Sequence, residues 1–279
     1  METLIAAIFV IFLMVFAGFN LAQTTMSAQQ TMQAAVVEMY DRHDVQDGTQ
    51  LTTVEAHTTD FGATILVTLA NTGMQAVSDF DKWDVIVHYG DDLAGYHINW
   101  LGTGNVNNEW SPGPLQLHIE SVTPASEIYN RGILDPGEQV TLTIRVSPPV
   151  EAGTGIVVRV ATPNGSGTTS MLAANNPPEV VVHSGITLET GQTVTISSTE
   201  LRTTDLDGDD LVYSIINSPT LGTLSYAVTF TQADIDAGLI TYTSSGTAGL
   251  DSFNFTVTDG KDTIALPFGI TILEPTPSP

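Results

Sequence analysis

The sequence predicts a mainly β protein in which one long N-terminal α-helix precedes two β-sandwich domains. Three observations carry this prediction. Residues 1–47 keep an apolar, helix-compatible pattern without a turn signal, and after Leu51 short runs alternate with a period of two between turn residues. The stretch AANNPPEVVV then interrupts this series, because two adjacent prolines cannot lie inside a central ladder, and a second series of strands follows.

The composition limits the classes of function. The 279 residues include no cysteine, which excludes disulfides, thiolate nucleophiles and zinc–thiolate sites. Seven basic residues against 31 acidic ones give a net charge of −24, which repels nucleic acid and anionic lipid headgroups. An acidic surface poor in lysine is expected both of a protein adapted to high salt and of a protein that binds calcium, and the composition favours neither.

The N-terminal helix is predicted to have two halves. METLIAAIFVIFLMVFAGFNLAQ is apolar from Leu4 to Phe19, and the segment from Thr3 to Ala22 has about the length that crosses a bilayer core. The pattern continues through QTTMSAQQTMQAAVVEMYDRHD with almost no charge, and Asp47-Gly48 supplies the stop. At 1.5 Å per residue the whole segment is a rod of roughly 65–70 Å.

This helix can be a cleaved signal, a simple anchor or a packing element. A signal peptide needs a basic start, yet the first basic residue is Arg42, so we expect the segment to be retained. An anchor needs about 20 residues and a basic cytoplasmic flank, which is missing before Leu4. The methionine- and alanine-rich second half favours packing against other helices.

The remaining chain divides into two predicted sandwiches and a tail. Residues 51–173 hold runs such as ATILVTLANTG, KWDVIVHYG and QVTLTIRV, whose spacing is typical of an antiparallel sandwich. Residues 174–274 hold a second set of strands, and residues 275–279 form a proline-rich tail.

Residues 1 to about 172 resemble a type IV filament subunit of the archaeal branch, the archaellins and archaeal pilins. An apolar N-terminal helix leads into a sandwich marked by ATILVTLANTG, ILDPGEQVTLTIRV and VRVATPNG. The resemblance implies a processed subunit whose helices pack as a filament core while the sandwiches form the wall. Bacterial pilins of the best-known kind carry glutamate at the fifth mature position, where this chain has Ile5, so the archaeal branch is favoured.

The resemblance also implies which side chains would pack in the filament core. Glu2 would either neutralise a neighbour's amino terminus or lie unpaired at the solvated end of the helix. The expected core residues are Glu2, Leu4, Ile8, Ile11, Val15, Gly18, Met26, Met32 and Val36.

Residues 175 to 272 resemble the cadherin-like repeats of large adhesins and chondroitin sulfate proteoglycans. NNPPE, TTDLDGDD, FTQADIDAGLITY and FTVTDG carry the likeness, which implies an extracellular, immunoglobulin-like sandwich. As an EF-hand loop the acidic stretch fails, because its twelfth position is Ile216 rather than a glutamate. The resemblance suggests calcium at Asp205, Asp207, Asp209 and Asp259; a solvated acidic turn is the alternative, and with one such repeat no repeat-to-repeat junction is expected.

The sequence also contains two glycosylation sequons and three tryptophans. Asn164-Gly-Ser and Asn254-Phe-Thr are glycosylation sequons, and alternation must turn Asn254 outward for it to be accessible. Trp83, Trp100 and Trp110 are expected in the core or rim of the first sandwich, with a carbohydrate platform as the alternative. No catalytic motif is recognisable, so the chain is not expected to be an enzyme.

The sequence therefore predicts a structural subunit that polymerises into an extracellular, archaellum-like filament for motility, with a cadherin-like domain outside. Its partners would be further copies of itself, the cytoplasmic membrane before assembly, and a surface ligand or neighbouring filament at the outer domain. No cofactor is required, apart from the calcium considered above. An adhesive pilus subunit and a membrane-anchored adhesin that does not polymerise are the alternatives.

Overall fold

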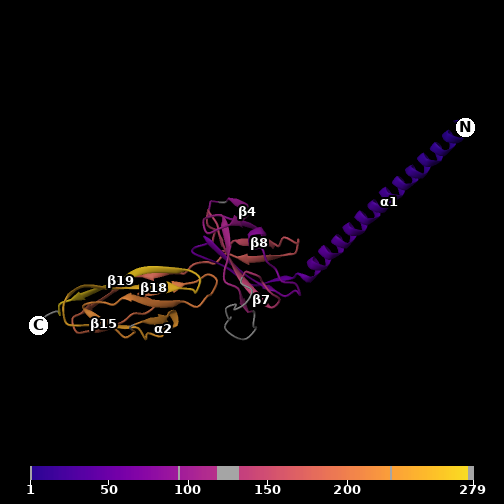
Figure 1. The fold of residues 1–279 in the computed structure, drawn as a ribbon. Helices are drawn as coiled ribbons and strands as arrows, with labels where there is room; N and C mark the ends of the chain where they lie inside the picture. Colours follow the sequence, from indigo (N-terminus) through magenta and orange to yellow (C-terminus); the bar gives the residue numbers. More distant parts are fainter. Residues whose placement is uncertain (1, 94, 118–131, 227, 276–279) are drawn as a thin grey trace.

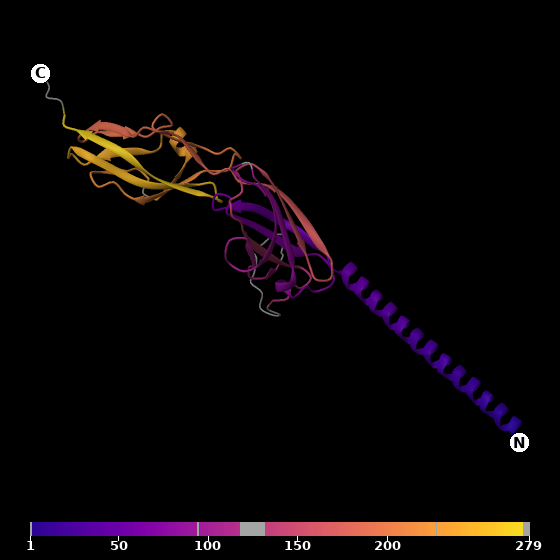
Figure 2. The ribbon, with the colours of Figure 1, turned by 90° about the horizontal axis from the view of Figure 1, so that it is seen from above.

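The computed structural model describes residues 2–93, 95–117, 132–226 and 228–275. The chain is elongated: a helix, a first group of strands and a second group of strands follow one another (Figures 1 and 2). Buried apolar side chains form two clusters, one between Leu51 and Ala174 and one between Ile186 and Ile272. One N-terminal helix followed mostly by strands confirms the predicted fold class.

Helix α1 spans Glu2–Gly48 and projects away from the strands (Figure 1). Every side chain from residue 9 to 41 and from 43 to 47 is exposed. Its apolar part, taken from Phe9 onward, is long enough and apolar enough to cross a membrane. The helix ends against a turn of the first sandwich, where the Gly48 carbonyl accepts hydrogen bonds from the backbone nitrogens of Met74 (2.7 Å) and Gln75 (3.0 Å). A Cβ on Gly73 would lie 2.4 Å from the same carbonyl, so this close approach requires glycine.

The first group of strands forms one strongly curved sheet. Its strands lie in the order β1-β2-β7-β5-β4-β3-β8-β9, with β6 paired to β7, and only β4 and β5 among them run parallel. A 2.6 Å hydrogen bond between the hydroxyls of Thr53 and Ser170 links β1 to β9 at the two ends of this order. The elements are β1 (Leu51–Thr59), β2 (Thr64–Asn71), the 3-10 helix η1 (Phe80–Lys82), β3 (Asp84–Gly90), β4 (Tyr96–Thr103), β5 (Glu109–Pro112), β6 (Gln116–Leu117), β7 (Glu138–Arg145), β8 (Gly155–Ala161) and β9 (Gly167–Ala173).

Strand alternation fills the core of the first sandwich. In β2, β3, β7 and β8 every second side chain is buried, as the period of two requires. Trp110 is fully buried and Trp83 is 3% exposed, with ring centroids 6.5 Å apart. Trp100 is 75% exposed, so the expectation that all three tryptophans pack in or around the core is wrong for Trp100.

The second group of strands packs as a sandwich of smaller sheets. A five-stranded sheet has the order β11-β19-β18-β14-β16, and β12-β17-β15 and β10-β13 form two further sheets. The elements are β10 (Glu179–His183), β11 (Ile186–Glu189), β12 (Thr193–Thr195), β13 (Leu201–Thr204), β14 (Val212–Asn217), β15 (Gly222–Leu224), β16 (Thr229–Thr231), α2 (Gln232–Asp236), β17 (Thr241–Ser244), β18 (Gly249–Thr258) and β19 (Thr263–Leu273).

The core of the second sandwich is aromatic and satisfies its buried polar groups. Phe253 and Phe268 stack with ring centroids 5.0 Å apart, and the Tyr242 hydroxyl donates to the Asp251 carboxylate at 2.7 Å. Burial is the main cause that raises the pKa of Tyr242, and burial also raises the pKa of Tyr213 to about 12. Both tyrosines therefore stay neutral and serve the packing.

Candidate metal centre

A polar site lies where the two sandwiches meet, and its first part is the linker after β9. The backbone nitrogen of Asn175 donates to the hydroxyl of Thr58, in β1, at 2.7 Å. Asn175 is only 6% exposed. Pro177 and Pro178 follow and restrict the backbone before β10 starts. The linker is thus fastened to the first sandwich before it enters the second.

The acidic turn between β13 and β14 forms the second part of the site. One carboxylate oxygen of Asp205 accepts hydrogen bonds from the backbone nitrogens of Asp207 (2.8 Å) and Asp209 (3.2 Å). Such a turn closes on its own aspartate, and Gly208 takes the positive φ of +80° that it needs. The flanking elements are strands, as expected when the EF-hand interpretation was rejected.

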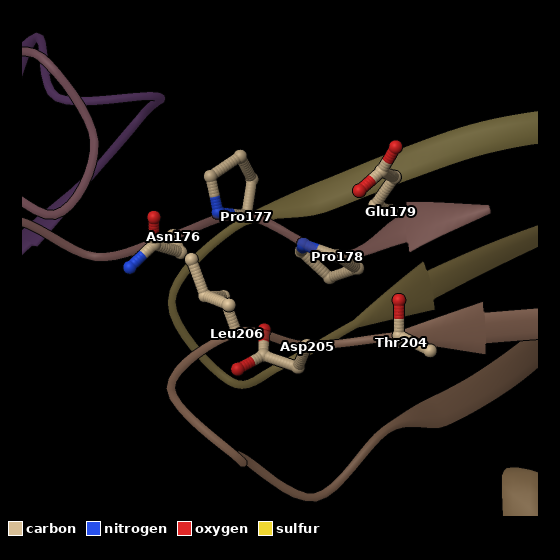
Figure 3. Close-up of a pocket in the computed structure, with 7 residues that line it drawn as sticks. All are labelled: Asn176, Pro177, Pro178, Glu179, Thr204, Asp205 and Leu206. Carbon is tan, nitrogen blue, oxygen red and sulfur yellow. The ribbon is translucent and has the colours of Figure 1, made fainter. Parts of the chain in front are cut away.

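The linker holds this turn through a second asparagine. The backbone nitrogen and the side-chain nitrogen of Asn176 each donate to the Asp207 carboxylate at 2.8 Å. Hydrogen bonds to the charged form, first of all the backbone one from Asn176, hold the pKa of Asp207 below its usual value. Beside them Asn176–Glu179 and Thr204–Leu206 line a pocket of about 450 Å³ (Figure 3).

The turn between β18 and β19 supplies the third part. Asp259 is 8% exposed, Asp262 is 2% exposed, and one Asp259 oxygen accepts from the backbone nitrogens of Lys261 (2.8 Å) and Asp262 (2.6 Å). The Asn175 amide donates to both carboxylates, at 2.7 Å to Asp259 and 2.8 Å to Asp262. Asn175 therefore bridges two buried carboxylates that would otherwise repel each other.

The first sandwich closes this part of the site from the other side. The backbone nitrogen of Phe61 donates to Asp262 at 2.8 Å, and the Thr59 hydroxyl donates to the Lys261 carbonyl. The acidic residues therefore do lie at a junction between domains, although not at one between two cadherin-like repeats. The contacts come from the end of β1 and the β1–β2 turn of the first sandwich.

Several oxygen atoms at this junction can accept a cation. One oxygen each from Asp205, Asp207 and Asp209 lies within 4.8 Å of the others. The second oxygen of Asp205 and the amide oxygen of Asn175 are buried and have no hydrogen-bond partner among the described residues. A buried acceptor without a donor is costly, and a cation is one group that would satisfy it.

The donor chemistry fits a hard cation. The ligand atoms are oxygens, which Ca²⁺ and Mg²⁺ prefer, and Ca²⁺ takes six to eight of them in a flexible arrangement. The three aspartates would supply part of such a set, and other oxygen atoms the rest. Asp259 is not part of the three-aspartate group; it reaches the site through Asn175.

A lysine already contacts this group. The Lys261 ammonium lies 2.8 Å from an Asp209 oxygen, and both side chains are 31% exposed. The hydrogen bond to Asp209 is the main cause that raises the pKa of Lys261, with Asp207 and Asp259 contributing through their charge. Lys261 thus places one positive charge beside the acidic residues of the two turns. If a divalent ion bound the same Asp209 oxygen, the Lys261 ammonium would have to move away from it.

Sequence reasoning missed Asn175, Asp262 and Lys261 as members of the site. Asn175 stands in the quoted stretch NNPPE, and the other two directly follow the quoted FTVTDG. Asn175 contacts Asp259 and Asp262, which lie 84 and 87 positions further along the chain, and no local sequence pattern indicates contacts of such long range.

The structure places the predicted filament-core residues on one continuous exposed helix. Val15 is 65% exposed, Met32 is 70% exposed, and Ile11, Met26 and Val36 are exposed as well. A Cβ at Gly18 would meet nothing within 4 Å. The side chains of Glu2, Leu4 and Ile8 lie outside the described residues. Each described core residue is therefore available to a partner outside the chain.

The two sequon asparagines differ in their surroundings. The Asn164 side-chain nitrogen donates to the Thr49 hydroxyl at 2.8 Å, so a glycan on this nitrogen would displace a contact between α1 and the first sandwich. Asn254 lies in β18 between Pro267 and Asn217 and is half-buried on the face opposite the core. Glycosylation of either residue stays a prediction.

Comparisons with known proteins identify relatives of the second sandwich and of longer parts of the chain. Residues 178–272 match the protein family described as cadherin-like. The chain is 25% identical over 210 residues to the human extracellular matrix organizing protein FRAS1, an alignment that covers 70% of this chain and 5% of that protein. It is 31% identical over 105 residues to extracellular matrix protein 3 of Lytechinus variegatus, covering 34% of this chain and 3% of that protein. The chain thus spans only 3 to 5% of the length of these relatives.

The chain also has a similar solved structure. The archaeal flagellum of Methanospirillum hungatei strain JF1 aligns at 15% identity with a TM-score of 0.40, covering 61% of this chain and 90% of that chain.

Proposed function

We propose that this chain is an extracellular structural subunit that assembles through α1 with further copies of itself into a helical filament. The observation that carries the proposal is the exposure of apolar side chains along all described parts of α1. A bilayer covers about 20 helical residues, which accounts for the first half of α1 only. Met26, Met32 and Val36, in the second half, are also exposed, and other helices are the surface they would pack against.

We propose an archaellum-like filament that carries the cadherin-like region on its outside, as the order of elements from α1 outward suggests. Relatives named as extracellular matrix proteins support an extracellular location for that region. Motility is the proposed use of the filament, and adhesion to a surface ligand is the alternative.

A membrane-anchored adhesin that never polymerises is the second candidate. The membrane-length apolar part of α1 favours it, because one such helix is sufficient to anchor the chain. The two candidates differ in what they require of the helix beyond the bilayer.

One substitution in each half of α1 tests these candidates, and the substitution in the second half separates them. Val15→Arg places an unpaired charge in the apolar half and should abolish both filaments and stable membrane insertion. Met32→Arg should abolish filaments, seen by electron microscopy of sheared cell-surface material, while the chain still fractionates with the membrane. Leu250→Arg, at a site 81% exposed on the second sandwich, is the matched control. Normal filaments from Met32→Arg would refute helix packing in this half and favour the anchored adhesin.

We further propose that the junction binds calcium through Asp205, Asp207, Asp209 and the amide oxygen of Asn175. The unpartnered, buried oxygens of Asp205 and Asn175 support this. Calcium that binds only the folded junction raises its melting temperature by mass action. Calorimetry of the full chain in detergent should show this rise with Ca²⁺ and its reversal by a chelator. Asp205→Asn should remove the rise, and Asp92→Asn, an exposed acid elsewhere, should keep it. An equal rise in melting temperature in both variants would mean that Asp205 does not bind calcium and that the acidic stretch is a solvated turn.

A further inference from the structure

One face of the first sandwich carries apolar side chains that the core does not use. Strands β4, β3, β8 and β9 lie side by side, and their registers align two straight rows across the sheet. One row is Ile98, His88, Val157 and Met171, and the other is Trp100, Ile86, Arg159 and Thr169. We call these eight residues the β4–β9 face.

The β4–β9 face is the outer side of these strands. The same strands bury Val85, Leu101 and Val158 on their other side. On the face itself Ile98 is 61% exposed, Trp100 75% and Met171 79%. Strands that are apolar on both faces are typical of sheets covered on both sides, whereas one-sided sheets alternate apolar and polar residues. The outer side therefore has the apolar composition of a sheet face that packs against another surface.

Trp100 in this face and Tyr96 beside it both contact neighbouring side chains. The Trp100 indole nitrogen donates to the Asp84 carboxylate at 3.1 Å, which fixes the ring while its faces stay exposed. On the neighbouring end of β4 the Tyr96 ring meets the His88 ring edge-on, with centroids 6.5 Å apart. Fixed rings lose little conformational entropy when a partner binds, which is one reason why tryptophan and tyrosine dominate binding energy in interfaces.

Charge distinguishes this face from the rest of the molecule. Its eight residues include Arg159 and no acidic residue, in a chain whose net charge is −24. Two copies of so acidic a chain repel each other over most of their surface. None of these eight residues is acidic, and the one carboxylate described at Trp100, that of Asp84, accepts a hydrogen bond from its indole nitrogen, so two copies can approach here with few carboxylates between them.

We infer that the β4–β9 face is a contact surface for a second copy of this chain. Tryptophan, tyrosine, methionine and arginine are the residue types enriched in protein interfaces. Trp100 is 75% exposed and Tyr96 is 69% exposed, and large aromatic side chains of this kind contribute most to the area that an interface buries. This inference rests on the proposed filament, because assembly through α1 brings first sandwiches side by side.

Photo-crosslinking in the full chain tests the inference. A benzophenone amino acid replaces Ile98, 61% exposed, in one variant and Leu250, 81% exposed on the second sandwich, in the control. After irradiation of purified filaments, the Ile98 variant should give adducts whose two peptides both come from this chain. Trp100→Asp in the same background should lower the adduct yield at least tenfold, and the Leu250 control should give little adduct.

The outcomes separate this inference from the proposed filament. Intact filaments without adducts from position 98 overturn the contact and leave the filament standing. Dimeric adducts from a chain that forms no filaments support the contact and refute the filament. Adducts to a surface glycan, with none between copies, overturn the inference and make Trp100 a carbohydrate platform instead.

Discussion

The first sandwich is joined to its two neighbours in opposite ways. At the helix joint, Asn164 donates to the Thr49 hydroxyl and the Ser166 hydroxyl donates to the Gln46 carbonyl at 2.9 Å, all neutral groups. At the sandwich joint, Asn175 bridges the buried carboxylates of Asp259 and Asp262. Neutral hydrogen bonds respond little to pH and salt, whereas converging charges respond to both. The hydrogen bonds of the helix joint should thus depend little on pH and salt, whereas those of the sandwich joint should depend on both.

The largest expected contrast comes from removing one asparagine at each joint. Asn175→Ala leaves two buried carboxylate oxygens without a donor, which should lower the free energy of unfolding by about 2–4 kcal/mol. Asn164→Ala removes neutral, partly exposed hydrogen bonds and should cost about 1 kcal/mol. Urea denaturation of the full chain in detergent measures both values.

Asn175→Asp sharpens this result. It adds a third carboxylate beside Asp259 and Asp262, so without divalent ions it should destabilise at least as much as Asn175→Ala. A saturating concentration of Ca²⁺ should restore more stability to Asn175→Asp than to Asn175→Ala, because only the former keeps an oxygen ligand. Equal costs for Asn175→Ala and Asn164→Ala would mean that the two joints do not differ.

The two joints also differ in how much of them the sequence predicts. The end of α1 at Asp47-Gly48 and the Asp205 turn depend on neighbours within a few residues, and both were predicted from local signals. The Thr58–Asn175 contact joins residues 117 positions apart and depends on how two unlike sandwiches stack. The exposure of Trp100 was missed for a related reason. YHINWLGT places apolar residues on both faces of β4, so alternation alone does not say which face is buried.

An intermediate effect is expected from pH, at the sandwich joint only. Folding lowers the pKa of Asp207, so its stabilisation is present above the unfolded value of about 3.9 and is lost as pH falls through the folded pKa. Folding raises the pKa of Lys261, so its stabilisation is present below about 10.4 and is lost as pH rises through the folded pKa. The sandwich joint should therefore be most rigid between these limits.

Spin labels can compare the joints directly, because the chain has no native cysteine. Cysteines at Met74 and Leu250, 85% and 81% exposed, report across the sandwich joint, and cysteines at Leu21 and Met74 report across the helix joint. The distance distribution should broaden below pH 4 and above pH 10 for the first pair and stay unchanged for the second. Broadening of both pairs together would point to unfolding of the first sandwich rather than to its outer joint.

The smallest effect is also the most discriminating, since its sign should depend on calcium. Lys261→Gln removes a half-exposed ion pair with Asp209, which should cost at most about 1 kcal/mol without divalent ions. With Ca²⁺ the same substitution should stabilise the protein, because no ammonium competes with the ion for the Asp209 oxygen. The calcium affinity measured by calorimetry should rise several-fold. Lys82→Gln, which removes the exposed pair with Asp79 far from the joint, is the matched control and should leave calcium affinity unchanged. If Lys261→Gln lowered calcium affinity instead, Lys261 would be supporting the geometry of the site rather than occupying the place of the ion.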